Sequence, residues 1–172
     1  LYLNMQGGFD ANFRDGFEEG AFKMRQLRIE MKGNINNWLS YRYRQRLNRS
    51  NDGGGMIDNV PTSIDYAGIG IKLNNRFNLF AGKQCTAYGG IEFDLNPIDI
   101  YEYSDMIENM SNFMTGLNIG YNLTSTQQLN LQILNSRNGS FDSTYGITEN
   151  EEGKLPDLKS GKLPLVYTLN LS

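Results

Sequence analysis

The chain contains no histidine, and this absence removes several classes of catalysis at once. Neither a Ser-His-Asp triad nor a Cys-His pair can be built, and the helical zinc motif that needs two histidines is excluded as well. Cys85 is the only cysteine among the 172 residues, so the chain has no intramolecular disulfide and no cysteine-based metal site. We therefore expect no enzymatic activity, no cofactor and no bound metal.

Long apolar runs are also missing. A helix that crosses a membrane needs about 18 or more consecutive apolar residues, and the chain has no such run. The mean hydropathy of -0.50 does not exclude a membrane β-barrel, because only alternate residues of each strand meet lipid in that fold. The formal net charge of -3 gives no indication of a nucleic-acid partner.

The chain does contain a repeated alternation of apolar and polar residues. A period of two predicts β-strands with one apolar and one polar face. In the segment from Phe22 the alternation slips, which predicts a β-bulge near Gln26. The predicted strands are Leu1–Phe13, Phe22–Gly33, Trp38–Leu47, Ile64–Leu73, Phe77–Cys85, Phe113–Leu123, Gln128–Ile133 and Leu163–Leu171. Four glycines fall on the polar faces, where we expect them to relieve crowding or permit curvature: Gly68, Gly70, Gly116 and Gly120.

The connections between these strands alternate between long and short. The long ones are Arg14–Gly20, Asn48–Ser63, Thr86–Asn112 and Ser136–Lys162, and the short ones are Asn34–Asn37, Asn74–Arg76 and Thr124–Thr126. Outer-membrane barrels have short periplasmic turns and long external loops. The sequence therefore predicts an all-β fold, an antiparallel transmembrane β-barrel with eight strands visible, in a bacterial outer membrane.

Three stretches add a resemblance to a known family. Phe22–Gly33 is a basic strand that precedes Trp38-Leu39-Ser40-Tyr41-Arg42, and Phe77–Gln84 follows later. Together they resemble the first half of the phosphate-selective porin O and P family, over about Phe22 to Tyr121. That family has a Gly-turn-Trp-Leu motif and a later strand that ends near Gly-Gln-Lys. In this chain the corresponding residues are Gly82-Lys83-Gln84, so the last two residues of the Gly-Gln-Lys motif are exchanged.

The resemblance implies a passive diffusion channel of the Gram-negative outer membrane. Such channels usually have about sixteen strands, often form homotrimers, and lie among membrane lipid and lipopolysaccharide. Eight strands are visible here, and Ser172 stands where such barrels usually end on an aromatic residue. We therefore expect residues 1–172 to form a single β-barrel domain that is incomplete at the C-terminus.

The resemblance also implies a preference for small anionic solutes, set by inward arginines and lysines. By position these are Arg28, Lys32, Arg42, Arg44, Arg46 and Lys83, and the polar face of the fourth predicted strand adds Lys72. Arg42, Arg44 and Arg46 form a row of like charges two residues apart. In a wide pore such a row attracts anions. In a narrow barrel, whose interior is filled by side chains, Glu30 and other carboxylates would neutralise it. The sequence leaves both interpretations open.

The connection that contains Ile91–Asn112 is acidic. Its carboxylates are Glu92, Asp94, Asp99, Glu102, Asp105 and Glu108. Their spacing matches no calcium loop, so a solvated external loop is favoured. The alternative is a loop folded into the lumen, which would place its carboxylates across from the arginines.

Three other functions compete with a channel. The first is a closed eight-stranded outer-membrane barrel with a plugged lumen, acting as an adhesion, structural or binding protein through its long external loops. The second is a small outer-membrane enzyme, against which the missing histidine argues. The third is a soluble β-sandwich that binds carbohydrate.

Overall fold

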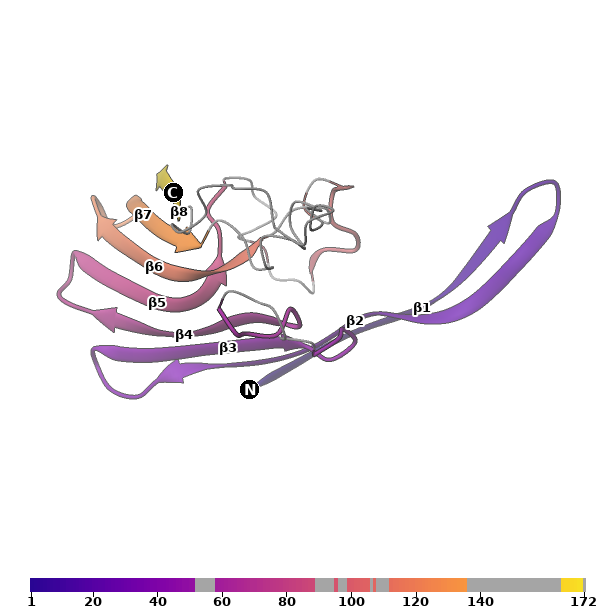
Figure 1. Cartoon of the computed structure of the whole chain (residues 1–172), viewed down its shortest axis with the longest axis horizontal. Coiled ribbons are helices and arrows are strands. Elements are labelled where there is room, and N and C mark those ends of the chain that lie inside the picture. The colour runs from indigo at the N-terminus through magenta and orange to yellow at the C-terminus, as the bar shows by residue number, and fades with distance from the viewer. Residues whose placement is uncertain are drawn as a thin grey trace, which may run out of the picture.

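The chain forms one antiparallel sheet of eight strands in sequence order, from β1 to β8 (Figure 1). The computed structural model describes residues 1–51, 58–88, 95, 99–105, 107, 112–135 and 165–171. The strands are β1 (Tyr2–Phe13), β2 (Phe17–Asn34), β3 (Leu39–Arg46), β4 (Ile64–Lys72), β5 (Phe77–Cys85), β6 (Phe113–Asn122), β7 (Gln128–Asn135) and β8 (Leu165–Leu171). In this part of the chain β1 and β8 do not pair, so the sheet is open and does not close into a barrel.

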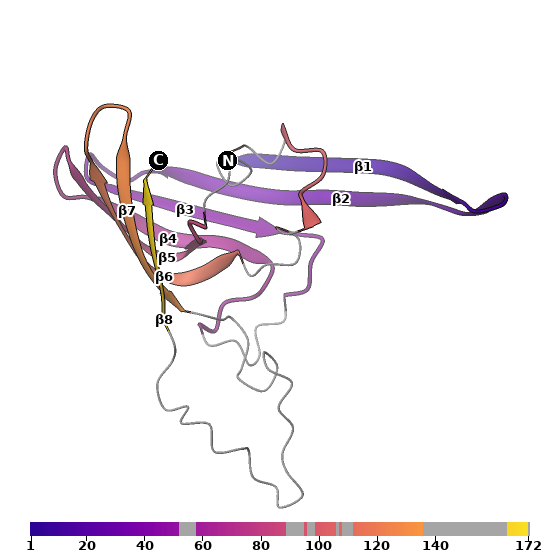
Figure 2. The same cartoon turned by 90° about the horizontal axis from the view of Figure 1, so that it is seen from above.

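The sheet is strongly twisted and curved. Seen from above, β8 runs across the direction of β1 and β2 (Figure 2). Within the described ranges, no helix has the length and apolar character needed to cross a membrane.

The prediction of eight antiparallel strands is confirmed, and the main error concerns the start of β2. The stretch Arg14–Gly20 was predicted as a long connection, but β2 already begins at Phe17. The turn needs only a few residues because Asp15 (φ 56°) and Gly16 (φ 147°) both adopt positive φ. The acidic residues that resembled a loop lie on an exposed face of the strand, where Glu19 accepts a hydrogen bond from Asn12 Nδ2 at 2.7 Å.

β1 and β2 extend far beyond the rest of the sheet. β3 pairs with β2 only from Arg28 to Asn34, whereas β1 follows β2 back to Phe17. Residues 7–25 therefore form a two-stranded ribbon, which projects to the right in Figure 1.

The β-bulge predicted near Gln26 is confirmed. Gln6 pairs with Gln26 and the next pair is Gly7 with Met24, so Arg25 is the additional residue. The bulge keeps Phe22 on the same face as the apolar residues of β1, where its ring lies 5.0 Å from that of Phe9. It turns Arg25 to the polar face, where the guanidinium forms an ion pair with Asp10.

Two of the three predicted tight turns share one construction at the end of the sheet opposite the ribbon (Figure 1). Asn36 Oδ1 accepts hydrogen bonds from the backbone N–H groups of Trp38 and Leu39, at 2.9 and 2.8 Å. Asn74 Oδ1 does the same for Arg76 and Phe77. These asparagines satisfy backbone donors that the turn would otherwise leave unpaired.

Burial is inverted relative to a soluble protein. Among the described residues, four hydrophobic side chains are buried, against ten polar or charged ones that include Arg44, Asp65 and Lys83. Large apolar side chains such as Ile69 and Leu131 are exposed instead. The sheet thus has a polar face on which many side chains are buried and an apolar face that is open, which is the arrangement expected where lipid is the outer solvent.

Glycines allow three central strands to approach one another closely. Gly82 pairs with Gly68 on one side and with Gly116 on the other. A Cβ atom at Gly82, where φ is +127°, would lie 2.2 Å from the carbonyl oxygen of Ala67, and one at Gly116 would lie 2.1 Å from that of Ile133. This row of glycines lets the sheet bend at a point where side chains would collide.

We expect Gly82→Ala to lower the free energy of unfolding by about 1–3 kcal/mol or more, the usual cost of a strained backbone. The measurement is the urea midpoint in detergent micelles, followed by the fluorescence of Trp38, which is the only tryptophan. Gly7→Ala is the matched control, because its Cβ would meet nothing closer than Lys23 O at 3.8 Å. Equal midpoints for the two variants would contradict the role given to the glycine row.

Candidate functional site

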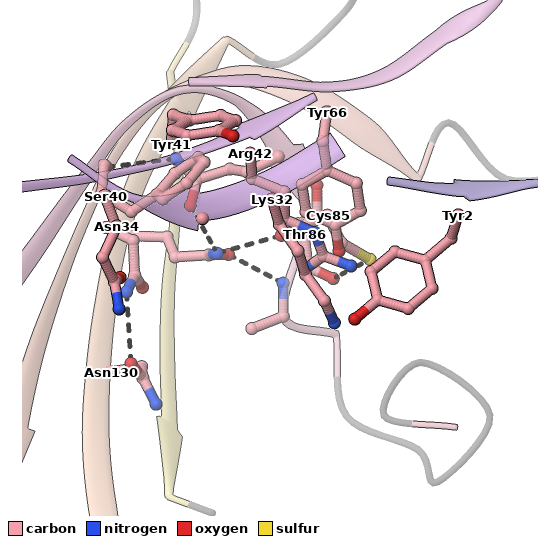
Figure 3. Close-up of a pocket in the computed structure, with 16 residues that line it drawn as sticks. Tyr2, Lys32, Asn34, Ser40, Tyr41, Arg42, Tyr66, Cys85, Thr86 and Asn130 are labelled. Atoms are coloured by element: carbon pink, nitrogen blue, oxygen red, sulfur yellow. Dashed lines mark hydrogen bonds between the residues drawn. The ribbon is translucent and has the colours of Figure 1, made fainter. Parts of the chain in front are cut away.

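An open hollow of about 800 Å³ lies on the polar face of the sheet (Figure 3). Strands from β1 to β7 contribute to its lining, so it is a feature of the whole curved sheet rather than of one hairpin. The polar side chains that line it include Lys32, Asn34, Ser40, Arg42, Gln84, Thr86, Asn118, Asn130 and Gln132, with the rings of Tyr2, Tyr41, Tyr66 and Phe80.

Arg42 is held in a fixed orientation beside this hollow. Its Nε donates to Glu30 Oε1 at 2.8 Å, and its guanidinium lies 3.7 Å from the centre of the Tyr66 ring. The side chain nevertheless stays 34% exposed. Arg42 can therefore meet a solute while its carboxylate and aromatic contacts keep it in place.

Arg44 and Arg46 are bound to a carboxylate instead. Arg44 Nε lies 3.1 Å from Asp65 Oδ2, and Arg46 Nη2 lies 2.8 Å from Asp65 Oδ1. The Asp65 side chain is 1% exposed, and that of Arg44 is 8% exposed. Arg44 is buried and Arg46 is half-buried, and both are structural partners of Asp65. The arginine row therefore divides into Arg42, which is the most exposed, and two side chains held by a buried carboxylate.

Asp65 reaches the polar face through a second bulge, which the sequence did not reveal. Arg44 pairs with Tyr66 and Gln45 pairs with Ile64, which leaves Asp65 as the additional residue. In a regular strand, Asp65 would share the apolar face with Ala67 and Ile69. A carboxylate on that face is costly in lipid, and this conflict was the signal from which the bulge could have been predicted.

Loop segments cover two more of the predicted pore-lining residues. Arg28 is buried under Tyr103, whose hydroxyl accepts a hydrogen bond from Arg28 Nη1 at 3.4 Å. Lys83 is 1% exposed, and its ammonium group donates to Pro61 O at 3.1 Å and lies 4.0 Å from Asp58 Oδ2. Neither charge is open to the hollow.

The two remaining lysines are exposed. Lys32 lines the hollow, and its Nζ lies 5.4 Å from the centre of the Tyr2 ring. Lys72 is also exposed but lies at the end of β4, next to a tight turn, and is not among the lining residues. Of the seven predicted residues, the structure thus brings Lys32 and Arg42 together at the hollow.

Part of the acidic connection folds back onto the polar face of β1 and β2. Gln6 Nε2 donates to Tyr101 O at 3.3 Å, and Gln26 Nε2 donates to Ile100 O at 3.4 Å. The carboxylates of Asp99, Glu102 and Asp105 are exposed, while Glu92, Asp94 and Glu108 lie outside the described residues. No cluster of three or more potential metal-ligating side chains occurs in the ranges that the structure describes.

The chain that leaves β5 turns across the polar face to reach β7. The backbone N–H of Ala87 donates to Gln132 Oε1 at 2.7 Å, and Gln132 Nε2 donates to Cys85 O at 3.0 Å. Thr86, between these contacts, is fully buried, and its hydroxyl has no hydrogen-bond partner among the described residues. Thr86 is also one of the residues that line the hollow.

We expect Asp65→Asn to lower the free energy of unfolding by about 3–5 kcal/mol, because it leaves the buried Arg44 and the half-buried Arg46 without a counter-charge. Urea midpoints in detergent measure this. Glu30→Gln is the matched control, since its partner Arg42 keeps contact with water, and its loss should be clearly smaller. Equal losses would show that Arg44 and Arg46 do not depend on Asp65 more than Arg42 depends on Glu30.

Comparison with known proteins places the chain in one protein family. The profile of the phosphate-selective porin O and P family matches residues 1–172, a longer stretch than the motifs between Phe22 and Tyr121. No curated protein and no solved structure matches the chain. A porin family agrees with contact with membrane lipid and with a channel rather than an enzyme. The chain therefore belongs to the phosphate-selective porin O and P family of bacterial outer-membrane porins.

Proposed function

We propose that the chain forms part of the wall of an outer-membrane pore through which small, hydrophilic, anionic solutes diffuse passively. The observation that carries this proposal is the hollow, because it sets the two accessible cations, Lys32 and Arg42, on the polar face of a sheet whose other face is apolar. In this proposal the hollow faces the lumen of the pore.

The mechanism is electrostatic. An anion that enters a narrow passage loses part of its hydration shell, and fixed cations offset that loss. Arg42 suits this role because Glu30 and Tyr66 already hold its guanidinium, so little side-chain freedom is lost when an anion arrives. Arg44 and Arg46, satisfied by Asp65, contribute less to the field at the hollow.

The open sheet supports a larger barrel. β1 and β8 each have an edge without a partner strand in the described part of the chain. Unpaired backbone groups are not tolerated in the hydrocarbon region of a bilayer. We therefore infer that further strands close the barrel, about sixteen in all, and that the Gram-negative outer membrane, lipopolysaccharide contact and a homotrimer belong to the same proposal.

A second candidate is a closed eight-stranded barrel with a plugged lumen. The enclosed group of Arg44, Arg46 and Asp65 favours it, since such packing fills a narrow lumen. Single-channel conductance in a planar bilayer separates the two candidates. A stable open channel of the purified protein supports the pore, and no conductance supports the plugged barrel.

We expect Lys32→Gln combined with Arg42→Gln to reduce anion preference. At about 7 Å in water, one unit charge changes the local energy by roughly 0.6 kcal/mol, so removal of both charges changes it by roughly 1.2 kcal/mol, or about eightfold in anion concentration. The measurement is the reversal potential across a salt gradient, with the full-length protein in a planar bilayer.

The matched control is Arg14→Gln combined with Lys23→Gln, which removes the same charge from the ribbon. Its reversal potential should stay at the wild-type value. A wild-type value in the Lys32 and Arg42 variant as well would overturn the assignment of selectivity to these two residues.

A further inference from the structure

The hollow has two chemically different sides. On the side of β2 and β3 it is cationic, with Lys32 and Arg42. On the side of β6 and β7 it is neutral, and its polar groups are the amides of Asn118, Asn130 and Gln132. A small anion such as inorganic phosphate would use the first side and leave the second empty.

The amides on the neutral side keep hydrogen-bonding capacity. Asn118 Nδ2 donates to Asn130 Oδ1 at 3.2 Å, which fixes the two side chains relative to each other (Figure 3 shows Asn130). The contact leaves the carbonyl oxygen of Asn118 as an acceptor and the NH₂ group of Asn130 as a donor. By contrast, Gln84 and Gln132 are occupied by contacts to backbone and to each other.

Aromatic rings also line the hollow. The exposed ring of Tyr2 offers an apolar face to the C–H groups of a solute. The ring of Tyr66 is already covered by the guanidinium of Arg42, which lies 3.7 Å from its centre, so Tyr66 positions Arg42.

The positive charge at the hollow is modest. Arg42 already shares its guanidinium with Glu30, which leaves Lys32 as the one lining cation without an ion pair among the described residues. Such a site suits one negative charge better than several. A volume of about 800 Å³ also exceeds what a single inorganic anion needs and lies within the range of small-molecule sites.

We propose that the hollow is a binding site for a hydroxylated organic monoanion of the sugar-acid class. Its carboxylate binds Lys32 and Arg42, and its hydroxyl groups bind Asn118 and Asn130. This inference rests on the proposed function, because the hollow must face the pore for a solute to reach it.

The test compares four solutes as blockers of chloride current through the full-length protein in a planar bilayer: glucuronate, acetate, glucose and inorganic phosphate. Glucuronate combines charge and hydroxyls, acetate has only the charge, and glucose has only the hydroxyls. We expect glucuronate to reach half-block at a concentration at least tenfold below that of each other solute. Equal half-block concentrations for glucuronate and acetate would overturn the inference.

A double variant and its control test whether Asn118 and Asn130 are responsible for the block by glucuronate. Asn118→Ala combined with Asn130→Ala should raise the half-block concentration for glucuronate by about tenfold, equivalent to about 1.4 kcal/mol, and leave that for acetate unchanged. Asn122→Ala is the control on the same face of β6, because Asn122 does not line the hollow. A wild-type half-block by glucuronate in the double variant would remove the two amides from the site.

The outcomes separate this inference from the proposed function. A channel without anion preference in its reversal potential contradicts the proposed function. A channel with anion preference but without stronger block by glucuronate contradicts only the sugar-acid site.

Discussion

The structure depends on one constraint, which is that all eight strands keep the same phase of apolar and polar residues. A slip of one residue would move every following side chain to the other face, and the exposed apolar face and the polar hollow would both disappear. Two bulges bear on this phase. The bulge at Arg25 keeps Phe22 and Met24 with the apolar residues of β1, and the bulge at Asp65 moves a carboxylate from the apolar row to the polar one. Each bulge therefore places on the polar face a charged residue that regular pairing would have put on the apolar face.

The ion pairs follow from this phase. Because arginines gather on one face, carboxylates must reach the same face to enclose them without a large desolvation cost. Asp65 does this for Arg44 and Arg46, while Glu30 orients Arg42 without covering it. A solute therefore does not meet the full positive charge of Arg42, Arg44 and Arg46. It meets the side chains that stay accessible after the ion pairs have formed, which are Arg42 and Lys32.

Alternation predicted most of the fold because it reports directly on which face each residue occupies. It gave the strands, the bulge near Gln26 and the polar-face position of Lys32 and Arg42. It failed at the start of β2, where Glu18 and Glu19 have the composition of a loop but lie on an exposed strand. It also missed the pairing of Asp65, since a bulge is a property of two strands in register and one strand read alone shows only a charge on the wrong face.

Accessibility at the polar face could not be predicted from any strand, because distant loop segments decide it. Arg28 and Lys32 lie on the same face of β2, on either side of Glu30, yet Tyr103 covers Arg28, and Lys32 stays exposed. Lys83 is enclosed by backbone carbonyls of Val60 and Pro61, more than twenty residues away in the sequence. Two chains with the same alternation but different loops would therefore present different charges to a solute. In this protein the strands determine which cations reach the polar face, and the loops determine which of them a solute can meet.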